Sequence, residues 1–124
     1  MIDVTHGQLL AEKMGWTWFP YFMGNDAMVP PGARSHISAI RIPPYSTDLQ
    51  KVIEIEDECF YVGGKEFKKA FTKILLDRIG HTIHNALRST AEDHSYALVE
   101  TINEFNLEYD YKTEQWKTND NQNQ

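Results

Sequence analysis

An apolar stripe between residues 67 and 79 constrains the fold of this chain more than any other feature of its sequence. Its members recur at the spacing of a single helical face: Phe67, Phe71, Ile74, Leu75 and Ile79. The lysines of this segment lie mostly outside the stripe, and Gly80 is placed to end the helix. The sequence therefore predicts an amphipathic helix whose apolar face is buried against the rest of the protein.

A second helix is expected over about residues 47–58. Ser46, Thr47 and Asp48 can each cap a helix, of which we expect Ser46 or Thr47 to be the cap, and the apolar residues that follow recur at helical spacing. A strand is the competing interpretation, because residues 52–58 alternate apolar and acidic side chains as a half-buried strand does. The glycine pair at 63–64 then separates this segment from the apolar stripe.

The rest of the chain predicts two further helices and several short strands. The helices cover about residues 6–14 and 91–105, and each begins after side chains that can cap it. The strands are indicated by aromatic and β-branched residues, or by alternation, between turn residues: 16–19, 27–29, 37–42 and 107–111. Residues 81–88 give no clear signal.

Together these elements predict a small α+β fold, in which a mainly antiparallel sheet packs with about four helices as a helix/sheet sandwich. With 124 residues, 41% of them apolar, the chain can bury the core of one domain, which we place at residues 1–117. Residues 118–124 are polar and have nothing to bury, so we expect them to form a disordered tail.

The net charge and the cysteine content restrict which partners this domain can bind and in which compartment it is found. A formal net charge of −6 argues against direct binding of nucleic acid and favours a protein partner with a basic surface, while a homo-oligomer stays open. The lone Cys59 cannot form an internal disulfide, which favours a reducing compartment. Residues 1–20 lack the pattern of a signal peptide, and no apolar run is long enough to span a membrane. We therefore expect a cytoplasmic protein.

The segment from Pro43 to Leu49 carries a resemblance to a known family. It reads Pro-Pro-Tyr-Ser-Thr-Asp-Leu, lies before an amphipathic run and follows a short helix that leads into Gly15-Trp16-Thr17. With these features the chain resembles the phage ABA sandwich domain family of small bacteriophage and prophage proteins. The resemblance implies a phage accessory protein of unassigned chemistry, with a sheet flanked by helices and a C-terminal helix from Thr90-Ala91. Between residues 59 and 89 the chain departs from that family, which has strands there.

One metal-binding arrangement is conceivable near the end of the apolar stripe. Asp77, His81 and His84 would share one side of a helix that continued past Gly80, and could then hold the metal ion of a hydrolase. Gly80 more simply ends the helix, which leaves two surface histidines behind it. We therefore expect no metal site.

Other catalytic patterns are incomplete. His36-Ile37-Ser38 is one half of a two-histidine phosphoesterase site, and the second His-x-Ser/Thr unit is missing. Cys59 beside Phe60 fits a buried, inert thiol better than a nucleophile. Gly63-Gly64-Lys65 lacks the remaining residues of a phosphate-binding loop. The sequence thus predicts no catalytic residue and no cofactor.

The candidate binding residues are an acidic run: Glu54, Glu56, Asp57 and Glu58. Carboxylates gathered on one surface can imitate the charge pattern of a nucleic-acid backbone and occupy a basic groove, whereas a run of this kind is more commonly a solvated helix face. Trp16 and Trp18 could anchor a partner, although aromatic residues more often fill the core.

We therefore expect a non-enzymatic phage or prophage accessory protein that binds a host protein, for example an inhibitor of antiviral defence of the anti-CRISPR kind. An alternative is a module that sequesters a small nucleotide, for which the sequence offers four arginines: Arg34, Arg41, Arg78 and Arg88. The second alternative is the metal-dependent hydrolase.

Overall fold

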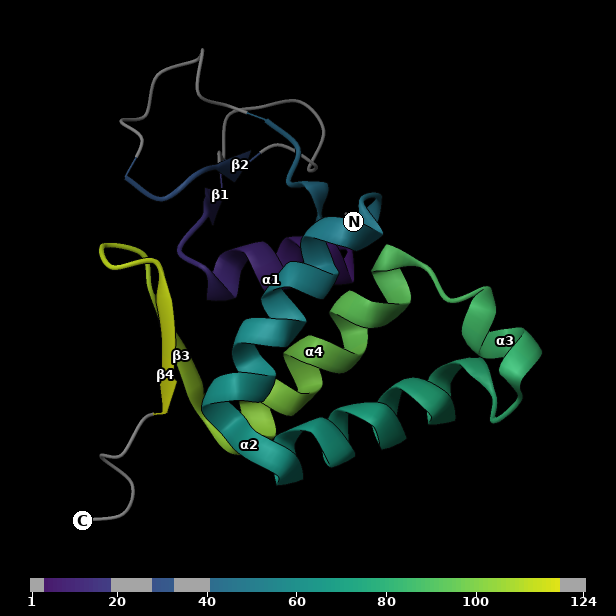
Figure 1. Ribbon diagram of the computed structural model, residues 1–124. Coiled ribbons are helices and arrows are strands. Elements are labelled where there is room, and N and C mark those ends of the chain that lie inside the picture. The colour runs from purple at the N-terminus through teal and green to yellow at the C-terminus, as the bar shows by residue number, and fades with distance from the viewer. Residues whose placement is uncertain (1–3, 19–27, 33–40, 119–124) are drawn as a thin grey trace.

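The structure is a computed structural model that describes residues 4–18, 28–32 and 41–118 (Figure 1). Within these ranges it contains four α-helices, one 3₁₀ turn and two separate two-stranded antiparallel sheets. This confirms a small α+β fold, with the strands divided between two small sheets. Within the same residues, no helix combines the length and the apolar character that a membrane crossing requires.

The N-terminal part is a short helix followed by a minimal strand pair. Helix α1 (His6–Lys13) begins with a capping box, in which the side chains of Thr5 and Gln8 bond to each other's backbone amides. Strand β1 (Thr17–Trp18) pairs antiparallel with β2 (Met28–Val29). Residues 33–40, which carry most of the strand expected at 37–42, lie outside the described residues.

The longest element is helix α2 (Leu49–Ile79). Its buried residues in the first half, Val52, Ile55, Glu56 and Cys59, recur at helical spacing, which settles the choice between helix and strand in favour of the helix. The glycine pair interrupts the helix as expected, because Gly64 has a non-helical backbone (φ 79°, ψ −167°) at a kink that divides α2 into two helical halves. Only glycine adopts this backbone conformation without strain.

An aromatic cluster fills the inside of this kink. Phe60 packs edge-to-face on Phe67 and Phe71, with ring centroids 6.0 and 5.2 Å apart, and Phe67 packs on Phe105 at 5.3 Å. A Cβ at Gly63 would collide with the Phe67 ring, so the glycine lets the two turns of the helix approach. Phe67 and Phe71 are buried as predicted, whereas Ile74, Leu75 and Ile79 are only half-buried.

Asp48 caps α2, and the expectation of Ser46 or Thr47 as the cap was wrong. Residues Pro44–Ser46 form the 3₁₀ turn η2, which carries the Ser46 side chain away from the start of α2. Its hydroxyl instead donates a hydrogen bond of 2.7 Å to Glu92.

The carboxylate of Glu92 joins three segments of the fold. Helix α1 has no acidic residue in its own first turn, and the backbone amides of His6 and Gly7 donate to Glu92 at 2.7 and 3.1 Å. These amides have no partner within the helix, so the contact satisfies them. A side chain at Gly7 would collide with Tyr45 and Ser46, so glycine is needed for this approach.

The C-terminal half consists of two helices and a hairpin. Helix α3 (Ile83–Leu87) lies in the segment that gave no sequence signal, and α4 (Ala91–Phe105) has the predicted bounds. Strand β3 (Leu107–Asp110) matches the expected strand, whereas its partner β4 (Gln115–Thr118) was not predicted. Thr118 therefore belongs to a strand and not to the expected tail, whose other residues, 119–124, lie outside the described residues.

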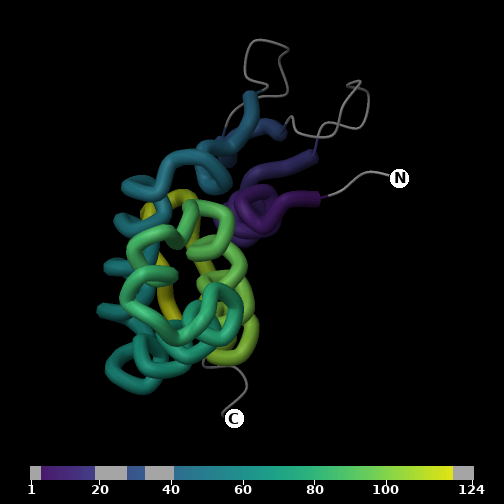
Figure 2. Tube along the Cα trace, turned by 90° about the vertical axis from the view of Figure 1, so that its right-hand side faces the viewer, coloured from purple at the N-terminus to yellow at the C-terminus, as the bar shows by residue number. Residues whose placement is uncertain are grey.

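The core lies where α1, the first half of α2 and α4 meet, and the β3–β4 hairpin packs along α2. The two views in Figures 1 and 2 agree that the β1–β2 pair lies beyond α1, at the end of the molecule away from the kink. One long face of α2 and the hairpin thus form a continuous surface, on which the candidate site lies.

Candidate acidic binding site

The structure divides the acidic run between the surface and the interior. Glu54, Asp57 and Glu58 are exposed, whereas Glu56 lies on the apolar face of α2 and is only 5% exposed. A carboxylate oxygen of Glu56 lies 2.6 Å from Nδ1 of His94 on α4. The expectation that Glu56 is displayed to a partner was wrong, since its side chain holds two core helices together.

A fourth exposed carboxylate comes from the turn of the β3–β4 hairpin. Glu114 lies just before β4, and its backbone has a positive φ of 57°. This left-handed conformation favours glycine, and a side chain there costs about 1 kcal/mol. We call Glu54, Asp57, Glu58 and Glu114 the acidic face.

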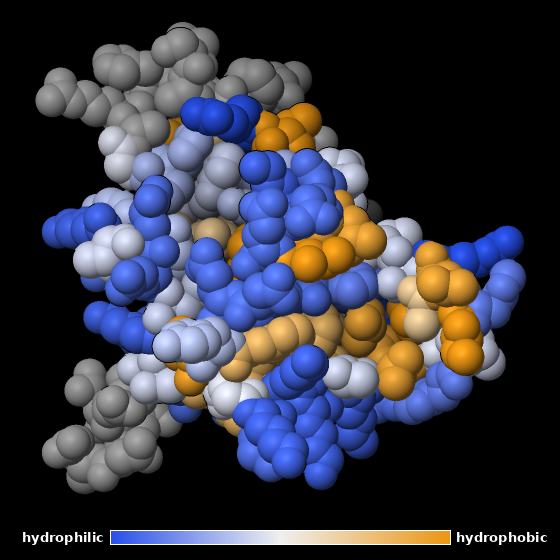
Figure 3. All heavy atoms as spheres, in the orientation of Figure 1, coloured by the Kyte–Doolittle hydropathy of each residue, from blue (hydrophilic) through white to orange (hydrophobic). Residues whose placement is uncertain are grey.

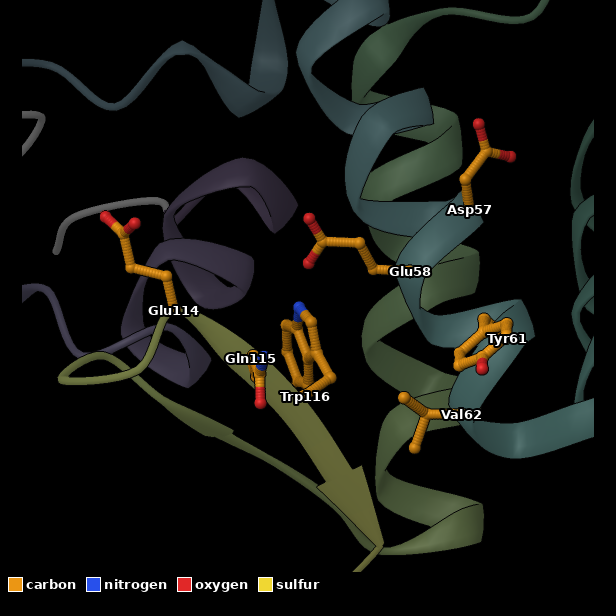
Figure 4. A pocket seen from close by; sticks show the side chains of 7 residues that line it. All are labelled: Asp57, Glu58, Tyr61, Val62, Glu114, Gln115 and Trp116. Carbon is orange, nitrogen blue, oxygen red and sulfur yellow. The ribbon is translucent and has the colours of Figure 1, made fainter.

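Three of these carboxylates line an open hollow of about 600 Å³ between α2 and β4. The other lining residues are Tyr61, Val62, Gln115 and Trp116. Figure 4 shows Glu58 projecting from α2 toward the hairpin, while Asp57 and Tyr61 lie farther from β4. A second hollow, of about 270 Å³, shares Glu58 and Glu114 and also reaches Glu54 and Lys51.

The electrostatics of the hollow favour a positively charged ligand. Partial burial raises the pKa of Glu58, and the nearby carboxylates of Glu54 and Glu114 raise it further. In the described part of the chain, no basic side chain forms an ion pair with any member of the acidic face. A cation bound here would relieve the repulsion between these groups.

Two aromatic side chains of opposite character border the hollow. The Tyr61 ring is 90% exposed, although it lies on the longest helix of the molecule. Trp116 is only 4% exposed and packs on Tyr109 across the hairpin, with ring centroids 5.1 Å apart. The hollow is thus bordered by one solvent-exposed aromatic ring, that of Tyr61, and one buried aromatic ring, that of Trp116.

The indole N–H of Trp116 is buried and has no hydrogen-bond acceptor among the described residues. Figure 4 shows its nitrogen turned toward the Glu58 carboxylate. Buried donors are nearly always paired, and an unpaired one costs about 1–3 kcal/mol. Sequence reasoning missed Trp116, because a single apolar residue between polar neighbours gives no strand pattern by itself.

Of the three residues proposed as metal ligands, only Asp77 and His81 contact each other. Asp77 and His81 approach to 2.8 Å, but Gly80 ends α2 and His84 lies on α3. Over residues 4–18, 28–32 and 41–118, no three His, Cys, Asp or Glu side chains group closely enough to hold a metal ion.

The arginines of the nucleotide hypothesis are dispersed. Arg41 pairs with Met28 beside β2, whereas Arg78 lies near the end of α2. The Arg78 guanidinium is engaged by Asp93 at 2.8 Å and lies over the Tyr96 ring. Arg88 follows α3, and Arg34 lies outside the described residues.

The remaining sequence candidates have structural positions or are not described. Cys59 is fully buried, and its burial raises the pKa of the thiol far above the ordinary value. Trp16 belongs to the core, and Trp18 donates its indole N–H to Glu12 at 2.8 Å. His36 lies outside the described residues.

Two further surfaces stand out in Figure 3. Blue, hydrophilic side chains gather over the second half of α2, where four lysines are exposed: Lys65, Lys68, Lys69 and Lys73. An orange patch covers α3, where Ile83 and Leu87 are exposed. Neither surface carries an unpaired buried group among the described residues, in contrast to the hollow beside Trp116.

Comparison of the chain with models of known protein families, with curated proteins and with solved structures gave no match. The likeness of residues 43–49 to the phage ABA sandwich domain family therefore stays a prediction. What the structure offers for function is the acidic face and the hollow that it borders.

Proposed function

We propose that this protein is a non-enzymatic binding module whose acidic face engages a basic surface of another protein. The observation that carries the proposal is the gathering of acidic residues from two elements, α2 and the β3–β4 turn, around two adjoining hollows, where no described basic side chain forms an ion pair with them. Keeping like charges together costs free energy in the isolated protein, and a cationic partner recovers it.

In the phage setting that the sequence resemblance implies, the partner is a host protein with a nucleic-acid-binding groove, for example a component of antiviral defence. Carboxylates on α2 would then occupy positions that phosphates occupy in the natural complex. The net charge of −6 supports this proposal, because it accelerates the encounter with a basic partner.

The test is a pull-down from a bacterial lysate with the parent protein and two charge-matched variants. The first variant reverses the part of the acidic face that lies on α2, as Glu54→Lys, Asp57→Lys and Glu58→Lys. Glu56 is left in place, because a lysine there would be buried beside His94 and would unfold the protein.

The control variant makes the same change in net charge on another surface. It reverses three exposed residues outside the acidic face: Glu66, Glu100 and Glu104. We expect the parent and the control to capture the same basic, nucleic-acid-binding proteins, and the variant reversed on α2 to capture less of them. Salt and added DNA should weaken the capture, because exposed charges are screened beyond about 8 Å at physiological ionic strength. Equal capture by all three proteins would overturn the proposal.

A further inference from the structure

We propose that the hollow between α2 and β4 is a socket for one guanidinium side chain of a basic protein segment, with a main-chain carbonyl of that segment accepting the Trp116 indole N–H. The inference rests on the proposed function and names the chemical group that the acidic face recognises. Its elements are charge, a free aromatic ring and an unpaired buried donor.

The carboxylates define the charged end of the socket. Glu58 comes from α2 and Glu114 from the hairpin turn, and both residues line the hollow, so a planar guanidinium bound there can donate to Glu58 and lies in the field of both carboxylates. Partial burial raises the pKa of Glu58 most, and the neighbouring carboxylates of Glu54 and Glu114 raise it further, so a bound cation would oppose the second effect. A phosphate-bearing ligand would instead add to the repulsion.

The aromatic residues define the sides of the socket. Tyr61 offers an open ring face, on which a guanidinium stacks better than an ammonium does. Val62 and the Trp116 ring supply apolar surface for the methylene groups of the same side chain. Arginine is therefore favoured over lysine.

The indole N–H of Trp116 is the unpaired hydrogen-bond donor of the socket. A cation alone leaves this donor unpaired, whereas a peptide brings a carbonyl together with its side chain. Since the Glu58 carboxylate faces the indole nitrogen, its turn toward an incoming guanidinium opens the N–H to that carbonyl. Binding of the side chain and binding of the main chain are thus linked through Glu58.

The backbone at Glu114 agrees with this role. A left-handed turn position that favours glycine carries a glutamate here, and this residue lines both hollows. Glu114→Gly is consequently a variant that relieves the backbone while it removes the charge. It separates loss of binding from loss of folding.

The experiment follows the indole N–H signal of Trp116 by ¹H–¹⁵N correlation spectroscopy of the intact protein. The signal is identified by its loss in Trp116→Phe or, should that variant not fold, by elimination with Trp16→Phe and Trp18→Phe. The probes are acetyl-Gly-Gly-Arg-Gly-Gly-amide and the same peptide with citrulline, which keeps the shape and loses the charge.

We expect the arginine peptide to shift the Trp116 signal with a millimolar dissociation constant, the lysine analogue to bind more weakly, and the citrulline peptide to leave the signal in place. Glu58→Gln and Glu114→Gly should each weaken binding of the arginine peptide about threefold, as expected for exposed ion pairs. The control Glu104→Gln, which lies outside the hollow, should leave it unchanged.

Equal shifts from the arginine and citrulline peptides, or no shift from either, would overturn the socket. Shifts confined to signals other than that of Trp116 would overturn it as well. The lysate capture by the acidic face is measured separately, so the socket can fail while the proposed function stands. If the arginine peptide still shifts the Trp116 signal but the lysate capture shows no salt dependence, the socket stands and the proposed function fails.

Discussion

Replacing Glu92 by alanine tests how the N-terminal helix is held to the rest of the fold. The substitution removes the acceptor of three hydrogen bonds and leaves the backbone amides of His6 and Gly7 unpaired at the start of α1. Each bond to a charged acceptor contributes about 1 kcal/mol when it is partly solvated. The Ser46 hydroxyl can turn to water, so we expect a loss of about 2–3 kcal/mol, or about 10 °C in Tm.

The pH dependence of this loss follows from the pKa of Glu92. Partial burial is the largest influence and acts to raise that pKa, but the hydrogen bonds from Ser46, His6 and Gly7 outweigh it and lower the pKa below 4.5. A carboxyl group whose pKa is lowered by folding stabilises the folded state above its unfolded pKa. The difference in stability between the parent and Glu92→Ala should therefore be complete near neutral pH and shrink as the pH falls below 4.5.

Urea unfolding followed by circular dichroism, at several pH values, measures both effects. Glu100→Ala is the matched control, because Glu100 lies on the exposed side of the same helix and its loss should change stability by less than about 0.5 kcal/mol. Equal stability of Glu92→Ala and the control, or a difference that does not vary with pH, would refute the reasoning.

The same assay checks the buried contacts. Glu56→Ala should cost about 3 kcal/mol, because it leaves Nδ1 of His94 without its carboxylate partner between the two helices, and additive effects with His94→Ala in a double-mutant cycle would contradict this coupling. Cys59 should react with iodoacetamide far more slowly in the folded protein than in urea, since burial raises its pKa, and equal rates would show that it is accessible. Ile74→Asp should cost only about 1–2 kcal/mol because Ile74 is half-buried, less than the loss of about 3–5 kcal/mol from Phe71→Ala, and the reverse order of melting temperatures would contradict the structure.

Helices were predictable here wherever a cap and an apolar face coincide. Helix α4 has the expected bounds because Thr90 caps it and closes a capping box with Asp93. The glycine pair indicated where α2 is interrupted, but not how its two halves pack, which depends on the contact of Phe67 with Gly63. Strand β4 was missed for a related reason, as its register comes from pairing with β3 and not from its own sequence.

The acidic face was predicted in part. Glu54, Asp57 and Glu58 are exposed as expected, while Glu114 joins them only through the hairpin. The interior position of Glu56 had a sequence signal, because it follows Val52 by four residues and precedes Cys59 by three, on the face that the helix buries. The unpaired Trp116 N–H had none, since it depends on where the tertiary fold leaves acceptors.

The kink at Gly64 also divides the charge of α2. The first half carries four carboxylates and one lysine, and the second half carries four lysines and an arginine with two carboxylates. Helix α2 therefore carries opposite net charge in its two halves, negative beside the hairpin and positive toward α3. The field of the basic partner proposed above would exert a torque on this charge distribution before contact and turn the acidic face toward the partner. Such pre-orientation would shorten the rotational search that a uniformly acidic protein makes before it binds.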